Sequence, residues 1–140
     1  MNRHQARELA FFLLFEHEFD KERTADEIYE TAKELREDVE EDEYVRAVLS
    51  GVLENEARIE TLISENAKGW SLRRISKVSL AVLKLSTYEM LYRPDIPIRV
   101  SLNESVELVK KYDDERARAF VNGILNTIAG IAAQERPDET

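Results

Sequence analysis

Two basic clusters in the 140-residue sequence have the residue types that suit single-stranded nucleic acid. The first seven residues contain Arg3, His4 and Arg7 and no acidic residue. Residues four apart share a helix face, so Arg3 and Arg7 form one basic edge. Cations at the start of a helix oppose its dipole, which favours a role in binding a partner rather than in stability. The second cluster consists of Arg116, Arg118 and Phe120.

Both clusters are candidate RNA-binding sites, because cations hold phosphates and an aromatic ring stacks on a base. The second cluster also has a purely structural interpretation. Phe120 falls on the apolar stripe of the last predicted helix, which favours burial of the ring, and Arg116 and Arg118 could simply be solvated on the outer face. The sequence leaves both interpretations open.

No residue pattern points to catalysis or to a metal or cofactor site. The chain has no cysteine, and its glycines at positions 51, 69, 123 and 130 are too dispersed for a phosphate-binding loop. His4 and His17 are thirteen residues apart, about 20 Å along one helix, so they cannot share an ion. Glu89 stands within the most apolar segment, where an ion pair with an arginine or lysine is favoured over a perturbed catalytic carboxylate. We therefore expect a protein that is not an enzyme and uses no cofactor.

Charge is distributed unevenly along the chain. The net charge is −9, but residues 1–70 carry 9 basic against 19 acidic residues, whereas residues 71–140 carry 11 against 10. Non-specific affinity for nucleic acid comes mainly from phosphate contacts, so the total argues against RNA while the local basic edge permits it. The longest apolar run, residues 9–15, is too short to span a membrane, so we expect a soluble, cytoplasmic protein.

Helical periodicity accounts for almost the whole sequence. Apolar residues at i, i+3 and i+4 spacing predict helices over residues 3–19, 24–38, 42–66, 75–91, 101–112 and 114–133. Thr24 with Glu27, and Ser101 with Glu104, match the capping box that begins a helix. Gly123 lies inside the last helix, which predicts close approach of another helix there.

The predicted fold is all-α, with six or seven helices in two joined sub-bundles. We expect a single domain over residues 1–133, with sub-bundles of about 1–68 and 69–133, and a flexible polar tail over residues 134–140.

The second half contains a series of ordered motifs. They are Gly69-Trp70, Ala81-Val82-Leu83-Lys84-Leu85, Tyr88-Glu89, Asp95-Ile96-Pro97, Asn103-Glu104 and Phe120-Val121-Asn122-Gly123-Ile124-Leu125. In this order and spacing the sequence resembles the NusB family of bacterial transcription antitermination factors. The resemblance is strong over residues 69–126 and weaker over residues 3–66, and the family's fold of two small helical bundles agrees with the predicted one.

The resemblance implies a non-enzymatic RNA-binding factor. The NusB family binds the boxA element of nascent RNA, chiefly in ribosomal RNA leaders, as a heterodimer with ribosomal protein NusE, and joins RNA polymerase together with other Nus factors. By this resemblance Arg3, His4, Arg7 and Phe120 contact RNA.

Partner docking is expected on the helix that contains Ser79, Lys84 and Glu89. Ser79 stands where relatives have an acidic residue facing NusE, and Asp113-Asp114-Glu115 brings negative charge towards the RNA face. We therefore expect weak intrinsic RNA binding that the partner strengthens.

Two other functions remain compatible with the sequence. The acidic first half and the thin arginine cluster would suit a helical protein–protein adaptor or homodimer without RNA binding. Domains similar to NusB also occur fused to RNA methyltransferases. Because this chain has no methyl-donor-binding motif, an accessory domain of that kind would have to act in trans.

Overall fold

The computed structural model describes residues 1–136, and within this range it is entirely helical. Seven α-helices and one 3-10 turn follow one another: α1 Arg3–His17, α2 Ala25–Leu35, α3 Glu43–Glu54, α4 Glu56–Asn66, η1 Leu72–Arg74, α5 Lys77–Tyr92, α6 Ile98–Tyr112 and α7 Glu115–Glu135. The predicted all-α class with six or seven helices is confirmed. None of the helices between residues 1 and 136 is long and apolar enough to cross a membrane.

Side-chain caps define where several helices begin. The predicted capping box at Thr24 and Glu27 starts α2, and the Asp114 carboxylate accepts a hydrogen bond of 2.8 Å from the backbone N–H of Ala117 at the start of α7. The box predicted at Ser101 is wrong, because α6 already begins at Ile98 after Pro97. Proline suits this position since the first N–H groups of a helix have no intrahelical partner.

The single helix predicted over residues 42–66 is two helices, α3 and α4, which meet at Asn55. The backbone of Asn55 leaves the helical region (φ −111°, ψ 17°), and its side-chain amide donates 2.8 Å to the carbonyl of Gly51. Asparagine competes in this way for backbone hydrogen bonds, so the apolar stripe continues while the helix breaks. Beyond α4, Gly69 adopts the left-handed conformation (φ 81°) that favours glycine and turns the chain towards η1.

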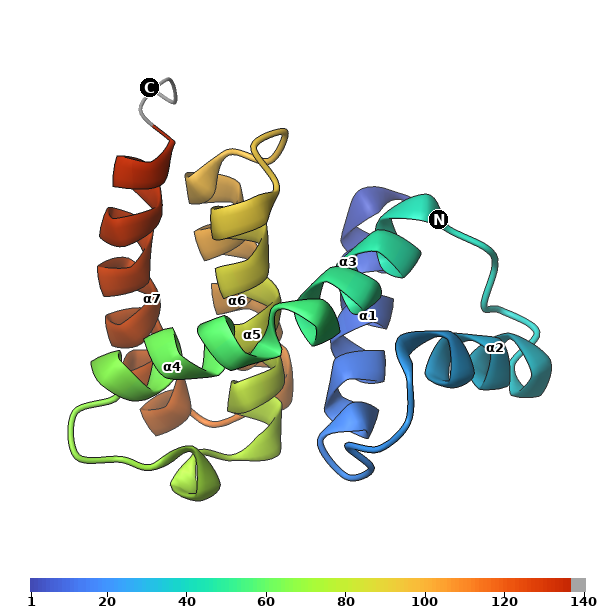
Figure 1. The fold of residues 1–140 in the computed structure, drawn as a ribbon, viewed down its shortest axis with the longest axis horizontal. Coiled ribbons are helices and arrows are strands. Elements are labelled where there is room, and N and C mark those ends of the chain that lie inside the picture. Colours follow the sequence, from blue (N-terminus) through green and yellow to red (C-terminus); the bar gives the residue numbers. More distant parts are fainter. Residues whose placement is uncertain (137–140) are drawn as a thin grey trace.

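Helix α5 is the centre of the molecule. It packs against α1, α3 and α4 as well as α6 and α7, and every residue from 79 to 90 is buried. Figure 1 shows α6 and α7 beside α5, with α1, α2 and α3 on its opposite side. Because α5 contacts helices of both halves, the division at residues 68 and 69 stays a prediction.

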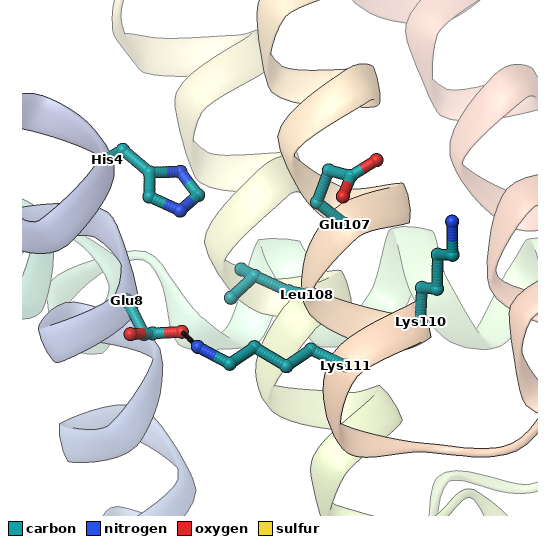
Figure 2. Close-up of a pocket in the computed structure, with 6 residues that line it drawn as sticks. All are labelled: His4, Glu8, Glu107, Leu108, Lys110 and Lys111. Carbon is teal, nitrogen blue, oxygen red and sulfur yellow. Dashed lines mark hydrogen bonds and ion pairs between the residues drawn. The ribbon is translucent and has the colours of Figure 1, made fainter.

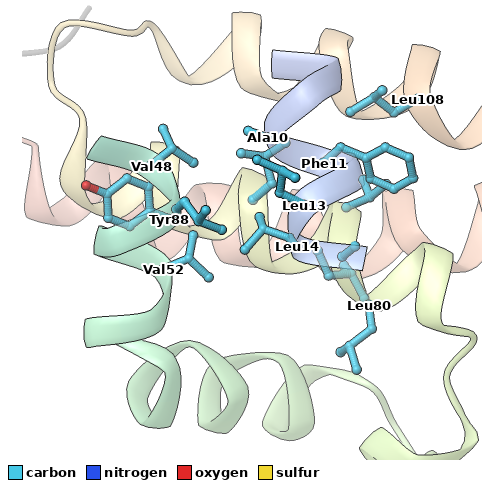
Figure 3. Close-up of a cluster of buried hydrophobic side chains, with 14 of the residues drawn as sticks. Ala10, Phe11, Leu13, Leu14, Val48, Val52, Leu80, Tyr88 and Leu108 are labelled. Carbon is cyan, nitrogen blue, oxygen red and sulfur yellow. The ribbon is translucent and has the colours of Figure 1, made fainter. Parts of the chain in front are cut away.

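A cluster of buried hydrophobic side chains joins α1 to this centre. Its side chains come from helices far apart in the sequence, and α1 lies between α3 and α6 within it (Figure 3). The labelled members are Ala10, Phe11, Leu13, Leu14, Val48, Val52, Leu80, Tyr88 and Leu108. Full burial of one such large apolar side chain stabilises a fold by about 1.5–3 kcal/mol. This packing fixes the position of α1, and with it the position of the basic residues at its amino end.

The carboxyl end of the described chain is anchored rather than free. Helix α7 continues to Glu135, and the guanidinium of Arg136 donates to the backbone carbonyls of Ile96 (2.7 Å), Arg93 (2.8 Å) and Glu89. The tail predicted from residue 134 is therefore wrong for residues 134–136. Its remainder, residues 137–140, lies outside the described residues.

One glycine has a clear packing role. A Cβ at Gly51 would lie 2.3 Å from the ring of Tyr88, so α3 and α5 meet here only because the side chain is absent. The close approach predicted at Gly123 is wrong, since a Cβ there would meet nothing within 4 Å. Nothing in the structure explains Gly123.

These two glycines give a matched test of the packing. Gly51→Ala should destabilise the protein by about 1–3 kcal/mol, because overpacking a close contact forces the ring of Tyr88 and its helix to move. Gly123→Ala should stabilise it by up to about 1 kcal/mol through helix propensity alone. Urea unfolding of both variants measures the two free energies, and equal signs would contradict the close contact of α3 with α5.

Candidate nucleic-acid interface

The amino end of α1 presents two of the three basic residues predicted there. Arg3 is exposed, forms no ion pair within residues 1–136, and lies with its guanidinium 4.4 Å from the ring centre of Tyr44. His4 is also exposed, with its Nδ1 atom 2.9 Å from the carboxylate of Glu104. The contact with Tyr44 orders the Arg3 side chain while leaving its charge accessible. Arg3 and His4 can therefore meet a ligand at this edge.

Arg7 is buried, with 3% of its surface exposed, so its predicted contact with RNA phosphate is wrong for this conformation. Its Nε atom donates a hydrogen bond of 2.8 Å to the carboxylate of Glu89, and its Nη1 atom lies 3.1 Å from the carboxylate of Glu104. Burial would lower the pKa of Arg7, but the charge and hydrogen bond of Glu89, together with Tyr44 and Glu104, outweigh burial and raise the pKa. A buried carboxylate is stable only when it is paired with a cation. Arg7 therefore points into the core towards Glu89, whereas Arg3, one turn earlier, stays on the surface.

A hollow of about 380 Å³ lies at the foot of α7. Trp70 and Phe120 meet edge to face in it, with ring centres 5.9 Å apart, and Trp70 is half exposed. Phe120 is half-buried, so it combines the packing role and the surface position that the sequence left open. The hollow is lined by Trp70, Arg74, Ile75, Ser76, Ser79, Asp113, Asp114, Arg116, Ala117 and Phe120.

Two cations stand at the walls of this hollow. Arg116 is exposed, and the guanidinium of Arg74 lies 5.8 Å from the ring centre of Trp70. Arg118 does not line the hollow; its guanidinium lies 3.6 Å from Glu115 on the same helix. Sequence reasoning missed Trp70 and Arg74 as site residues. The signal that could have found them is the absence of any acidic residue between positions 66 and 88.

A groove of about 350 Å³ lies between α1 and α6. Figure 2 shows its lining, in which Leu108 and Lys111 of α6 extend towards α1. The lining residues are His4, Glu8, Glu107, Leu108, Lys110 and Lys111. Glu8 accepts hydrogen bonds of 2.8 Å from both Lys111 and Tyr112. Burial alone would raise the pKa of Glu8, but these bonds lower it, so the acid stays charged and paired. Lys110 forms no ion pair within residues 1–136.

The groove and the hollow are connected by α6. Lys111 lies at the carboxyl end of this helix, and Asp113, only two residues later, lines the hollow. A ligand that enters beside His4 can therefore follow α6 towards the rings of Trp70 and Phe120. Unpaired cations and exposed rings along one path are what a single strand of nucleic acid requires.

Comparison with known proteins agrees with this architecture. Residues 4–130 match the model of the NusB family. The chain belongs to the NusB family. It is 40% identical over 131 residues to the transcription antitermination protein NusB of Acetivibrio thermocellus, covering 94% of this chain and 90% of that protein. The resemblance seen in the sequence is thereby confirmed, as is the expectation that the protein is not an enzyme, since this family consists of non-enzymatic antitermination factors.

Solved NusB structures share the whole fold. NusB of T. maritima superposes with a TM-score of 0.85 at 37% identity, covering 99% of this chain and 98% of that one. A chain in a complex of the antitermination factors NusB and NusE with double-stranded RNA superposes with a TM-score of 0.79 at 26% identity. The match covers 94% of this chain and 99% of that one.

The residues that the NusB resemblance assigned to partner docking are all buried. The Ser79 hydroxyl donates a hydrogen bond of 3.0 Å to the carboxylate of Asp113, which also accepts one of 2.9 Å from the Ser76 hydroxyl. Glu89 accepts hydrogen bonds from the hydroxyl groups of Tyr44 and Ser101 in addition to Arg7. The preference for an ion pair at Glu89 is thus confirmed, whereas direct partner contact by Glu89 is wrong for this conformation.

Lys84 is a structural cation at the centre of an acidic cluster. Its ammonium donates to Glu18 (2.6 Å), Glu60 (2.8 Å) and Glu56 (2.9 Å), and only 1% of its surface is exposed. Burial would lower the pKa of Lys84, but these hydrogen bonds raise it, so the charge is permanent. His17, Glu18 and Glu56 lie close enough to hold a metal ion, but Lys84 already supplies the positive charge there. The predicted partner contact of Lys84 is therefore wrong for this conformation.

Breaking the buried pair should separate the roles of the two arginines of α1. Arg7→Met leaves Glu89 charged and buried, which should cost about 3–5 kcal/mol of unfolding free energy. Arg3→Gln, at the exposed position one turn earlier, is the control and should change stability little. Arg7→Met with Glu89→Met should recover part of the loss. Chemical denaturation measures all three, and equal stability of the two single variants would contradict the buried pair.

Lys84→Met should destabilise the protein in a pH-dependent way. At pH 7 it leaves three carboxylates with the half-exposed Lys21 as their one remaining cation within residues 1–136 and without the buried one, a loss of about 3–5 kcal/mol. Burial alone would raise the pKa of Glu56, but its hydrogen bonds with Lys84 and Lys21 outweigh burial, so the pKa is lowered. Without Lys84 these acids take up protons more readily, so the difference from the wild type should shrink as the pH falls below about 4.5.

Denaturation at a series of pH values provides the measurement for Lys84→Met. Lys33→Met is the matched control, because Lys33 also pairs with two carboxylates, Glu30 and Glu41, but at the surface. A loss at Lys84 that stays constant with pH would contradict the cluster.

Proposed function

We propose that this chain is a transcription antitermination factor that binds boxA-like single-stranded RNA together with ribosomal protein NusE. The pair would join RNA polymerase and other Nus factors on nascent transcripts in the cytoplasm, notably ribosomal RNA. The observation that carries the proposal is the hollow in which the exposed edge of Trp70 meets Phe120 beside Arg74 and Arg116. Aromatic rings can stack only on unpaired bases, so this surface favours a single strand over a duplex.

The path from the amino end of α1 supports the same ligand. Arg3 and Lys110 are cations without ion pairs within residues 1–136. Lys110 lines the α1–α6 groove, and Arg3 precedes His4, which also lines it. Phosphates bound there would direct bases towards Phe120. The chain's membership of the NusB family, and its similarity to the NusB of a complex with NusE and RNA, support both partners.

The acidic turn before α7 supports the need for a basic partner. Asp113 accepts hydrogen bonds from two serine hydroxyls and Asp114 caps α7, so both carboxylates are held in place beside the hollow. Adjacent charges are not screened at physiological salt, where the screening length is about 8 Å. A basic protein docked on this turn would remove the repulsion and raise RNA affinity. Ser79, Lys84 and Glu89 would support that surface from within rather than touch the partner.

Loss of the ring at the hollow should weaken RNA binding. Phe120→Leu keeps most of the apolar volume but removes the stacking surface, worth about 1–3 kcal/mol per base, so affinity for a boxA-like RNA should fall roughly tenfold. Arg3→Gln should lower the salt dependence of binding by roughly one phosphate contact. Arg58→Gln is the control, because this arginine pairs with Glu135 at the far end of α7. Fluorescence anisotropy with labelled RNA measures each variant.

The same titration repeated with the cognate NusE tests the partner. The mixture should bind boxA-like RNA more tightly than either protein alone. If the two proteins do not associate at micromolar concentration, or the mixture gains no affinity, the heterodimer is wrong and a homodimeric adaptor becomes the better account.

A further inference from the structure

Residues 68–77, between α4 and the start of α5, form a basic segment in an otherwise acidic protein. Lys68, Arg73, Arg74 and Lys77 are all exposed, and none of them forms an ion pair within residues 1–136. Elsewhere the basic residues are largely neutralised; Arg46, for example, pairs with Asp26, Glu30 and Glu41. Four free cations in ten residues are therefore a local feature that the net charge of −9 hides.

The exposed aromatic rings of the described chain both stand beside this segment. Phe19 is 64% exposed and Trp70 is 50% exposed. The ammonium of Lys77 lies 5.4 Å from the ring centre of Phe19, and the guanidinium of Arg74 lies 5.8 Å from that of Trp70. Each exposed ring thus has a cation of the segment at its face.

The segment is held in place at both ends. Ala67 and Ile75 are buried, at 2% and 6% exposure, and Gly69 makes the turn between them. The Ser76 side chain accepts a hydrogen bond from the Ser79 backbone and donates one to Asp113. The cations and rings are therefore carried by an ordered backbone, which lowers the entropy lost when a ligand binds.

We infer that residues 68–77 and Phe19 form a second RNA platform, which takes nucleotides of a single strand beyond those held at Phe120. The inference rests on the proposed function and extends its path, since Trp70, Arg74 and Ser76 line the hollow and Lys77 and Phe19 follow. Stacking on rings and phosphate contacts with cations do not depend on base identity, so the platform accepts any sequence. An acidic protein would use the four cations but would leave both exposed rings without a partner.

The test uses a twelve-nucleotide oligouridine RNA, which has no boxA element, and the full chain. Trp70 is the sole tryptophan, so its fluorescence reports stacking directly. The wild type should bind with quenching of Trp70. Arg73→Gln with Lys77→Gln should weaken binding about tenfold and lower the salt slope by about 1.4, at 0.7 for each lost contact with a single strand. Phe19→Ala should weaken binding as well.

The matched control is Arg99→Gln with Arg58→Gln, which removes two exposed arginines outside the segment and should leave oligouridine binding unchanged. Thermal unfolding checks that every variant folds. Unchanged oligouridine affinity in the Arg73 and Lys77 double variant would overturn the platform. Competition by polyglutamate as effective as that by RNA would overturn it in favour of an acidic protein partner.

Comparison of two RNAs separates this inference from the proposed function. If only the platform is wrong, boxA-like RNA is still preferred over oligouridine, and the double variant behaves as the wild type. If only the boxA function is wrong, the two RNAs bind equally, and both lose affinity in the double variant.

Discussion

The buried charges of α5 are the constraint on which the rest of the structure depends. This helix is enclosed on all sides, yet it carries the carboxylate of Glu89 and the ammonium of Lys84. A charge in such a place must be paired and hydrogen-bonded. Glu89 is therefore bound by Arg7 of α1, Tyr44 of α3 and Ser101 of α6. Lys84 is bound by one acid after α1 and two acids of α4.

These contacts fix how the helices are placed rather than simply adding stability. Apolar packing tolerates small shifts of one helix along another, but a buried charge loses its partner if the register changes. The amino end of α1 is thereby set against α3 and α6, which places Arg3 over the ring of Tyr44 and His4 in the groove beside Glu104. The same ion pair removes Arg7 from that surface. The candidate RNA-binding edge thus consists of those basic residues of α1 that do not pair with the buried charges of α5.

Much of the fold could be predicted from the sequence, because apolar spacing and caps such as Thr24 are local. The errors arose where a side chain acts outside the local pattern. Asn55 breaks a helix by binding the Gly51 carbonyl, and Ser101 matches a cap but instead donates to Glu89 from within a helix. The candidate site was harder to predict from the sequence. Arg3 and Arg7 look equivalent in the sequence, and only the position of Glu89 across the core distinguishes them. Similarly, Trp70 became a site residue only through its contact with Phe120, fifty residues away.

An acidic protein can present an RNA-binding surface because its charges act over short distances. Beyond about 8 Å salt screens exposed charges, so a strand at the foot of α7 responds to the neighbouring residues and little to the total of −9. Many acids of the first half are also paired already, as those around Arg46 and Lys21 are. What a strand meets near the hollow is Arg74, Arg116 and the acidic turn. If the proposed function holds, the balance between those cations and that turn, rather than the isoelectric point, determines how far RNA binding depends on a partner.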